Sequence, residues 1–276
     1  MSQSPPLKIL FIGDVVGSPG RKIVAQTLPR LIPRWGLGLV VCNAENSAGG
    51  SGLTAKCYDE LADAGVDVFT MGDHIYRKDD VLDLFEKTST ILKPANFPPD
   101  SPGQEVVVAR ARDGTTVGVF SLMGRTYMRP VDCPFRAADR VLAGLTGEAK
   151  VVVVDVHAEA TSDKKLLGRY LDGRVSAVFG THTHVATADE EILPGGTAYQ
   201  TDVGMTGPHD SILGRRYDRV LKTATTFLPT FFEVATGDPR LNGALVEVDP
   251  DTGRALALRR VSIDQNEVRR LMTESD

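Results

Sequence analysis

The fold is decided first by the stretch from Leu7 to Arg21, LKILFIGDVVGSPGR, in which an apolar run ends at Asp14 and leads through glycines into a helix-like segment. Two interpretations are open: a glycine-rich loop that binds phosphate through its backbone, or a strand that delivers Asp14 to a site. Gly13, Gly17 and Gly20 do not have the spacing of G-x-G-x-x-G, and no Gly-Lys-Ser/Thr follows them. A dinucleotide-binding oxidoreductase is therefore the weakest alternative.

The alternation of apolar runs and helix-like segments continues along the chain. Runs at 37–46, 66–74 and 150–160 precede helix-like segments at 54–65, 77–88 and 162–173, and a further run follows at 174–184. These runs are apolar at successive residues, which is typical of strands covered on both faces. The sequence therefore predicts an α/β fold built from βαβ units. Residues 105–124 read as a hairpin that turns at Asp113-Gly114, and residues 231–263 as additional antiparallel strands.

Length and composition are those of an ordinary globular protein, with 276 residues of which 42% are hydrophobic and 24% charged. No low-complexity linker, long charge run or internal repeat divides the chain, so we expect one domain over residues 1–276. In the helix expected from Arg21, Pro29 and Pro33 should kink or shorten the helix, because proline lacks an N–H and clashes with the preceding turn.

Charge and cysteine content limit the class of partner. A net charge of −5 argues against a long nucleic-acid footprint and favours a small substrate. Three widely spaced cysteines indicate free thiols and neither a disulfide framework nor a Cys-rich zinc site. The N-terminal residues lack a basic region before a long apolar core, and no segment approaches the roughly 18 apolar residues of a membrane span, so we expect a cytoplasmic protein without membrane partners. Exposed sheet edges are compatible with a homo-oligomer.

Polar side chains follow five of the expected strands. Taken singly, such residues are more often helix caps or turn residues than ligands. Four of the five histidines lie at these strand ends, however, and every end carries a carboxylate, an amide or an imidazole. Because the carboxyl ends of parallel strands line the crevice of an open α/β sheet, we expect these side chains on one rim. They are Asp14, Glu45 with Asn46, Asp73 with His74, His157, and His182 with His184.

This mixture of oxygen and imidazole donors, without thiolates, suits a pair of ions such as iron, manganese, zinc or magnesium. Two ions roughly 3.5–4 Å apart can stabilise both the attacking and the leaving oxygen of a phosphoryl displacement, and they need a bridging carboxylate. Glu45 is the candidate bridge, since it sits centrally in the strand order. The glycines near Asp14 then let the chain turn close to the ions.

These motifs resemble those of the calcineurin-like metallophosphoesterases in type and order: GD at 13–14, NAEN at 43–46, GDH at 72–74, a lone histidine at 157 and GTHTH at 180–184. Within that superfamily the chain is most similar to the bacterial 2',3'-cyclic-nucleotide 2'-phosphodiesterase branch, through its GDVVG opening, the NSAGGSGL loop at 46–53 and TDVGMTG at 201–207. The resemblance runs from about Lys8 to about Gly207. It implies a layered α/β/β/α sandwich with mixed sheets and antiparallel C-terminal strands.

The resemblance also implies roles for single residues. One metal would be bound by Asp14, Glu45, Asn46 and His184, and the other by Glu45, Asp73, His157 and His182. The two ions, with iron or manganese favoured over zinc or magnesium, would supply the hydroxide that attacks phosphorus. His74 would donate a proton to the leaving oxygen, a task that suits an imidazole because its unperturbed pKa lies near neutrality.

Two positions depart from the superfamily pattern. Val16 stands where the usual Asp-x-His opening has its histidine, a loss for which Asn46 would compensate. Asp73 stands where asparagine is usual, which would add negative charge at the metals.

Further candidates surround this set. An arginine near a loop is more often solvated or salt-bridged than bound to phosphate, although a guanidinium fits phosphate well. Asp189 either orients a ligand histidine or belongs to an exposed acidic turn, and His209 has no assigned role. The candidates for substrate contact are Arg21, Arg125 and Asp202.

The sequence therefore predicts a dinuclear metal phosphodiesterase that hydrolyses small cyclic nucleotides. Two alternatives stay open. One is a phosphomonoesterase or protein phosphatase built on the same metals, and the other is a regulatory protein that binds a nucleotide or metal without turnover.

Overall fold

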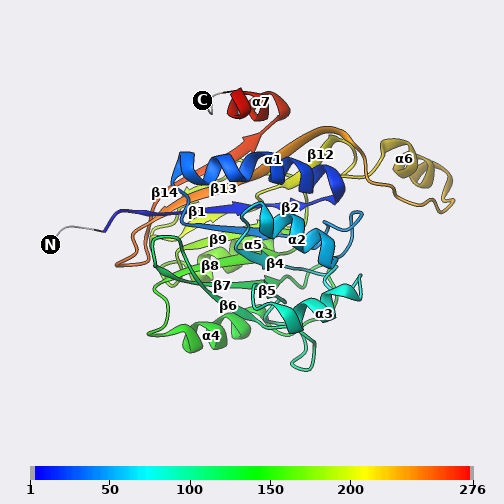
Figure 1. The fold of residues 1–276 in the computed structure, drawn as a ribbon. Helices are drawn as coiled ribbons and strands as arrows, with labels where there is room; N and C mark the ends of the chain where they lie inside the picture. The colour runs from blue at the N-terminus through cyan, green and yellow to red at the C-terminus, as the bar shows by residue number, and fades with distance from the viewer. Residues whose placement is uncertain (1–3, 274–276) are drawn as a thin grey trace.

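The computed structural model describes residues 4–273, which form two mixed β-sheets stacked face to face with helices on the outer faces (Figure 1). The first sheet has eight strands in the order β2-β12-β13-β1-β3-β4-β5, with β14 paired to β13. Its strands are β1 (Leu7–Ile12), β2 (Asp14–Val15), β3 (Leu39–Asn43), β4 (Val68–Thr70), β5 (Ile91–Leu92), β12 (Met205–Asp210), β13 (Gly237–Val248) and β14 (Ala255–Ile263).

The second sheet has six strands in the order β10-β11-β9-β8-β7-β6. Its central strands β7, β8 and β9 are parallel, whereas β6 and β10 pair antiparallel at the two edges. The strands are β6 (Val106–Arg110), β7 (Thr116–Met123), β8 (Val151–His157), β9 (Ala177–Thr181), β10 (Glu191–Ile192) and β11 (Ala198–Gln200).

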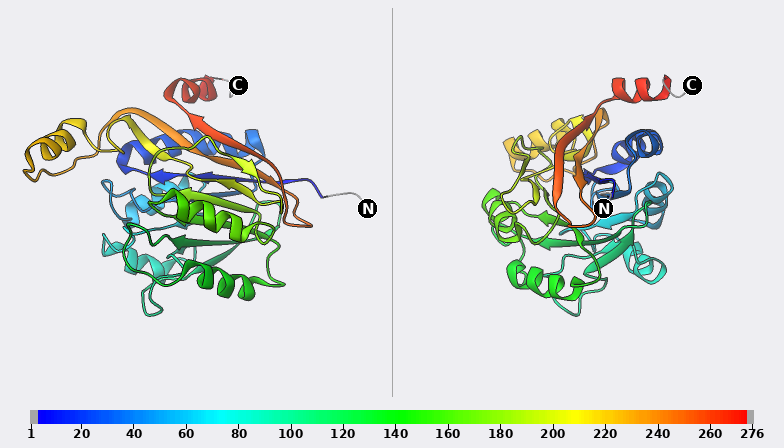
Figure 2. Two further views of the ribbon diagram at one scale, coloured as in Figure 1. Left: turned by 180° about the vertical axis from the view of Figure 1, so that it is seen from behind. Right: turned by 90° about the vertical axis from the view of Figure 1, so that its left-hand side faces the viewer.

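Helices cover both outer faces, and Figure 2 shows the two helical layers on opposite sides of the sheets. The first sheet is covered by α1 (Gly17–Trp35), α2 (Ala55–Asp63), α3 (Asp80–Lys87) and α7 (Gln265–Thr273). The second is covered by α4 (Pro134–Leu145) and α5 (Thr161–Leu171). The remaining helix, α6 (Tyr217–Thr226), buries none of its residues and projects from the body (Figure 1).

Strand β1 shows why apolar residues do not alternate with polar residues along these strands. Leu10 and Ile12 pack toward the helices, whereas Ile9 and Phe11 pack between the sheets. The ring of Phe11 meets that of Phe179 across the sandwich, with centroids 5.4 Å apart. Because successive residues face two different hydrophobic layers, every position of the strand is apolar. The layered α/β/β/α sandwich predicted from the sequence is confirmed.

Several local predictions are also confirmed. The hairpin of β6 and β7 turns at residues 113–114, and β13 pairs antiparallel with β1 and β14. The expected shortening of the first helix is wrong, because α1 continues through Pro29 and Pro33 to Trp35. Both prolines lie on its exposed face, where carbonyl groups that lose a helical hydrogen bond can bond to water. The single domain over 1–276 stays a prediction, and residues 1–3 and 274–276 lie outside the described part.

Candidate metal centre

The five polar strand ends meet at one end of the sandwich, but they come from both sheets. Asp14 begins β2, and the turns that carry Glu45 with Asn46 and Asp73 with His74 follow β3 and β4 of the first sheet. His157 ends β8, and His182 and His184 follow β9 of the second sheet. The rim that the sequence analysis assigned to one open sheet is therefore shared between two sheets, and the candidate site lies where their carboxyl ends meet.

One group of four ligands matches a predicted metal set. Glu45, Asp73, His157 and His182 each offer one ligand atom, and these atoms all lie within 4.8 Å of one another. His157 Nε2 is 3.1 Å from Asp73 Oδ1 and 3.3 Å from Glu45 Oε1. His182 contributes Nδ1, which lies 3.1 Å from His157 Nε2. Four acceptor atoms that converge in this way are a suitable cage for a divalent ion.

The second predicted set also includes Glu45. His184 Nε2 is 3.7 Å from Asp14 Oδ1 and 3.2 Å from Asn46 Nδ2, and the same amide nitrogen is 3.3 Å from Glu45 Oε1. Glu45 thus contacts members of both sets, as a bridging carboxylate must. The Asn46 amide oxygen instead accepts a hydrogen bond from His74 Nδ1 at 2.8 Å, so binding of a metal through this oxygen requires the amide to turn over.

Two of the imidazole rings are oriented by hydrogen-bond acceptors. His184 Nδ1 donates a hydrogen bond to the carbonyl oxygen of Leu213 at 3.0 Å, and His182 Nε2 lies 3.2 Å from a carboxylate oxygen of Glu159. A proton on each of these nitrogens leaves the other ring nitrogen with a lone pair directed at the carboxylates. This is how metal-binding histidines are usually oriented in proteins. The donor set therefore fits a cation.

The charges of the cluster also fit a cation. Burial would raise the pKa of Glu45, but the neighbouring His157 lowers it. Burial would also raise the pKa of Asp73, but its contacts with His157 and His182 lower that pKa. Burial alone would lower the pKa of His157, but the Glu45 and Asp73 carboxylates raise it well above its usual value. A proton on His157 thus supplies the positive charge that a bound metal would replace.

Two glycines next to predicted ligand residues allow close packing of the backbone. A Cβ on Gly72 would collide with the imidazole ring of His157, and one on Gly13 would collide with the carbonyl oxygen of Gly204. Glycine is required at both positions because these close approaches leave no space for a side chain.

The loop that carries His182 and His184 has a strained backbone, since their φ angles are +93° and +65°. Asp202 holds this loop: its Oδ2 accepts hydrogen bonds from the Thr183 amide at 3.2 Å and hydroxyl at 2.7 Å. The Lys164 ammonium lies 2.6 Å from the same oxygen, and both side chains of this ion pair are 1% exposed. Asp202 therefore joins the loop of His182 and His184 to Lys164 of α5.

The remaining candidates are Arg21, Arg125 and Asp189. Arg21 forms an ion pair with Glu60 at 2.6 Å and donates to the carbonyl oxygen of Ser47. Arg125 is exposed and follows β7, whose last residue pairs with His157. Asp189 accepts from the Thr201 amide at 3.1 Å and pairs with Lys165 at 3.2 Å, so it does not orient a ligand histidine. All three cysteines are free thiols, as predicted.

Sequence reasoning missed the residues that orient the ligands. Glu159 stands two residues after His157, a spacing that offered a weak signal. Leu213 acts through its backbone carbonyl, which leaves no trace in the residue type.

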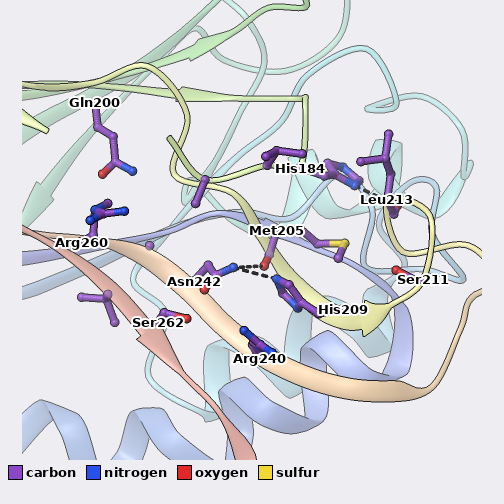
Figure 3. Close-up of a pocket in the computed structure, with 14 residues that line it drawn as sticks. His184, Gln200, Met205, His209, Ser211, Leu213, Arg240, Asn242, Arg260 and Ser262 are labelled. Carbon is purple, nitrogen blue, oxygen red and sulfur yellow. Dashed lines mark hydrogen bonds between the residues drawn. The ribbon is translucent and has the colours of Figure 1, made fainter. Parts of the chain in front are cut away.

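A cleft of about 670 Å³ is lined in part by His184 and the two residues after it (Figure 3). Figure 3 shows the His184 ring at its edge, turned toward Leu213. His209 lies within it, where Nε2 is 2.9 Å from the Asn242 amide nitrogen and Nδ1 is 2.9 Å from the carbonyl oxygen of Gly207. These contacts place His209 apart from the two ligand sets.

Two stacked mixed sheets between helical layers, with oxygen and imidazole ligands at the strand ends, define the metallophosphoesterase-like sandwich class. Residues 10–261 match the family of YmdB-like proteins, and the chain belongs to this family. The 2',3'-cyclic-nucleotide 2'-phosphodiesterase of Bacillus subtilis (strain 168) is 45% identical over 260 residues, which cover 94% of this chain and 98% of that protein. The predicted resemblance is thereby confirmed.

Two solved structures are similar to this chain over nearly its whole length. A hypothetical protein from Thermus thermophilus is 41% identical with a TM-score of 0.88, over 94% of this chain and 99% of that one. A protein from Mycoplasma pneumoniae, described as a novel phosphatase, is 32% identical with a TM-score of 0.88, over 99% of this chain and 98% of that one. Among residues 4–273, no helix combines the length and apolar character that crossing a bilayer demands.

Proposed function

We propose that the protein is a dinuclear metal phosphodiesterase that hydrolyses small cyclic nucleotides of the 2',3' type. The observation that carries the proposal is the pair of ligand sets that share Glu45, with His74 beside them. The printed activity of the Bacillus subtilis relative, at 45% identity over nearly the whole chain, supports the choice of substrate.

Each side chain then has a task. Asp14, Asn46 and His184 would hold one ion, Asp73, His157 and His182 the other, and Glu45 would bridge them. Bound ions would polarise the phosphoryl oxygens and lower the pKa of a water, and we favour iron or manganese over zinc or magnesium for a site of mixed carboxylate and imidazole ligands.

His74 is the proposed proton donor to the leaving ribose oxygen. Its side chain is 28% exposed, so a substrate can reach it, and its backbone amide is fixed by a 3.0 Å hydrogen bond to Glu45 Oε2. Once the Asn46 amide turns over to bind metal through oxygen, its nitrogen donates to His74 Nδ1. In the neutral ring the proton then lies on Nε2, which is 3.7 Å from Asp73 Oδ2 and would donate it to the leaving oxygen.

Substrate contacts are proposed for Arg125, whose exposed guanidinium is available to a phosphate. Arg21 and Asp202 stay proposed substrate contacts, although Arg21 pairs with Glu60 and Asp202 is buried against Lys164. A small phosphodiester is the expected partner, with no long nucleic acid and no membrane. Cytoplasmic location, where free thiols stay reduced, and homo-oligomerisation are further parts of the proposal.

The test compares wild-type and His74→Ala protein on 2',3'-cyclic AMP, bis-p-nitrophenyl phosphate and p-nitrophenyl phosphate. We expect wild type to cleave the diesters, and His74→Ala to lose about 10²- to 10⁴-fold in turnover because the leaving oxygen lacks its proton donor. Metal content, measured on the same samples, should stay near that of wild type.

The other outcomes separate the alternatives. Faster cleavage of the monoester would favour a phosphatase, which is how the Mycoplasma pneumoniae structure is described. Bound metal with neither ester class cleaved would favour a binding protein and overturn the proposal.

A further inference from the structure

Asp155 is a buried carboxylate inside an apolar strand. In β8, Val152, Val154 and Val156 pack toward the helical layer, whereas Val151 and Val153 pack between the sheets. Alternation therefore places Asp155 on the inner face, directly before His157 on that face, and both are fully buried. A carboxylate in this position is costly unless it is hydrogen-bonded, so its partners identify what it does.

The partners of Asp155 come from three neighbouring strands of both sheets. Its Oδ2 accepts hydrogen bonds from Thr70 Oγ1 of β4 at 2.5 Å and from Asn43 Nδ2 of β3 at 3.1 Å. Its Oδ1 accepts from Thr181 Oγ1 of β9 at 2.7 Å. The carboxylate thus joins the last inward-facing residues of the two sheets, directly behind the candidate metal centre.

The number of available protons determines which atom donates in the hydrogen bond between Thr181 and His157. When Asp155 is ionised its carboxylate only accepts, and the Thr181 hydroxyl has one proton, which goes to Asp155. Thr181 Oγ1 lies 2.8 Å from His157 Nδ1, so it must accept from that nitrogen. The competing donor, Asn43 Nδ2, lies 3.4 Å from Nδ1 and is closer to Asp155. His157 therefore carries a proton on Nδ1, and Nε2, which lies 3.1 Å from Asp73 Oδ1, is the nitrogen whose lone pair a metal would take.

We propose that Asp155 is a positioning residue for the metal centre, which acts through the Thr181 hydroxyl to hold the proton of His157 on Nδ1 and its Nε2 lone pair toward Asp73 and Glu45. This Asp155–Thr181–His157 relay rests on the proposed function for its metal, but not for its hydrogen bonds. His182 and His184 are oriented by direct acceptors, and His157 is oriented through a hydroxyl.

The experiment compares three variants by metal affinity, measured by competition with a chelator. Thr181→Val removes the hydroxyl at nearly constant shape, Thr181→Ser keeps it, and Thr70→Val is the matched control because it removes the other hydroxyl from Asp155 without touching His157. Loss of such an outer partner typically costs 10- to 100-fold in metal affinity. We expect that loss for Thr181→Val, with Thr181→Ser and Thr70→Val close to wild type. Equal losses in both valine variants, or no loss in either, would overturn the relay.

A second measurement needs no variant. Nitrogen NMR of the His157 ring in zinc-loaded wild-type protein should show the proton on Nδ1 and none on Nε2. A proton on Nε2 would overturn the relay whatever the variants do.

The relay and the proposed function fail separately. Protein that binds metal, shows the Nδ1 proton and cleaves no phosphoester would overturn the proposed function and leave the relay intact. Protein that cleaves 2',3'-cyclic AMP with the proton on Nε2 of neutral His157 would overturn the relay alone.

Discussion

At the scale of single residues, the cysteines show how position sets chemistry. Cys133 is half-buried before the first turn of α4, where the backbone N–H groups of Arg136 and Phe135 lower the pKa of its thiol and the guanidiniums of Arg125 and Arg136 add to the effect. Burial, with the negative charges of Asp155 and Asp14, raises the pKa of Cys42. The two thiols should therefore react very differently.

We expect iodoacetamide to alkylate Cys133 first in the native protein. Because its pKa is lowered, its thiolate persists to a pH below the ordinary cysteine value of about 8.5, and its rate should fall only below that lowered pKa. Peptide mass spectrometry over a pH series measures this, with Cys133→Ser as control. Labelling of Cys42 at a similar rate in folded protein would contradict the assignment.

Individual residues also show what the sequence could predict about the site. Asp14, Glu45 and the strand-end histidines could be identified as candidate ligands because each of them follows an apolar run. Arg21 could not be placed in the same way, since its partner Glu60 lies 39 residues away and only the folded chain brings them together. Asp155 is visible within VVVVDVH as an acid in an apolar run, but it was assigned no role from the sequence, because its relay depends on the Thr181 hydroxyl of another strand.

At the scale of elements, the ligand loop after β9 depends on α5. The buried pair of Lys164 and Asp202 joins this helix to Thr183, between two histidines with positive φ. Removal of one partner of a buried pair leaves an uncompensated charge. The loop geometry could not be predicted from the sequence, because Asp202 follows it by about twenty residues and Lys164 precedes it by a similar distance.

Lys164→Met should lower the free energy of unfolding of metal-free protein by about 3–5 kcal/mol, measured by urea denaturation. The neighbouring Lys165→Met is the matched control: Lys165 is more than half exposed and pairs with Asp189 at the surface, so its loss should cost about 0–1 kcal/mol. Similar costs for the two variants would contradict a stabilising role of the buried Lys164–Asp202 pair.

At the scale of the whole molecule, the space between the sheets changes character toward the site. Phe11, Phe179 and their neighbours form an apolar layer, and the last inward positions of the strands become Asn43, Thr70 and Thr181. The apolar layer explains why the sandwich could be predicted from continuous apolar runs. The division of the strand ends between two sheets could not be predicted. Alternating strands and helices give the same sequence pattern whether the strands join one sheet or two.

Phe179→Ala should destabilise the protein by about 3–5 kcal/mol, because it opens a cavity between the sheets opposite Phe11. Tyr127→Ala is the control, since Tyr127 is 88% exposed and its loss should change stability by no more than about 0.5 kcal/mol. Thermal or urea unfolding of the two variants measures the difference. A Phe179→Ala protein as stable as the control would mean that the two sheets do not share a core at this point.

The central claim is that two ions held on either side of Glu45 produce the hydrolytic activity. The most direct measurement is a titration of metal-free protein with manganese or ferrous iron, in which turnover of 2',3'-cyclic AMP is followed against ions bound per chain. The account predicts that activity rises to a plateau at two ions per chain and is lost on chelation. A plateau at one ion, or two bound ions without turnover, would contradict it.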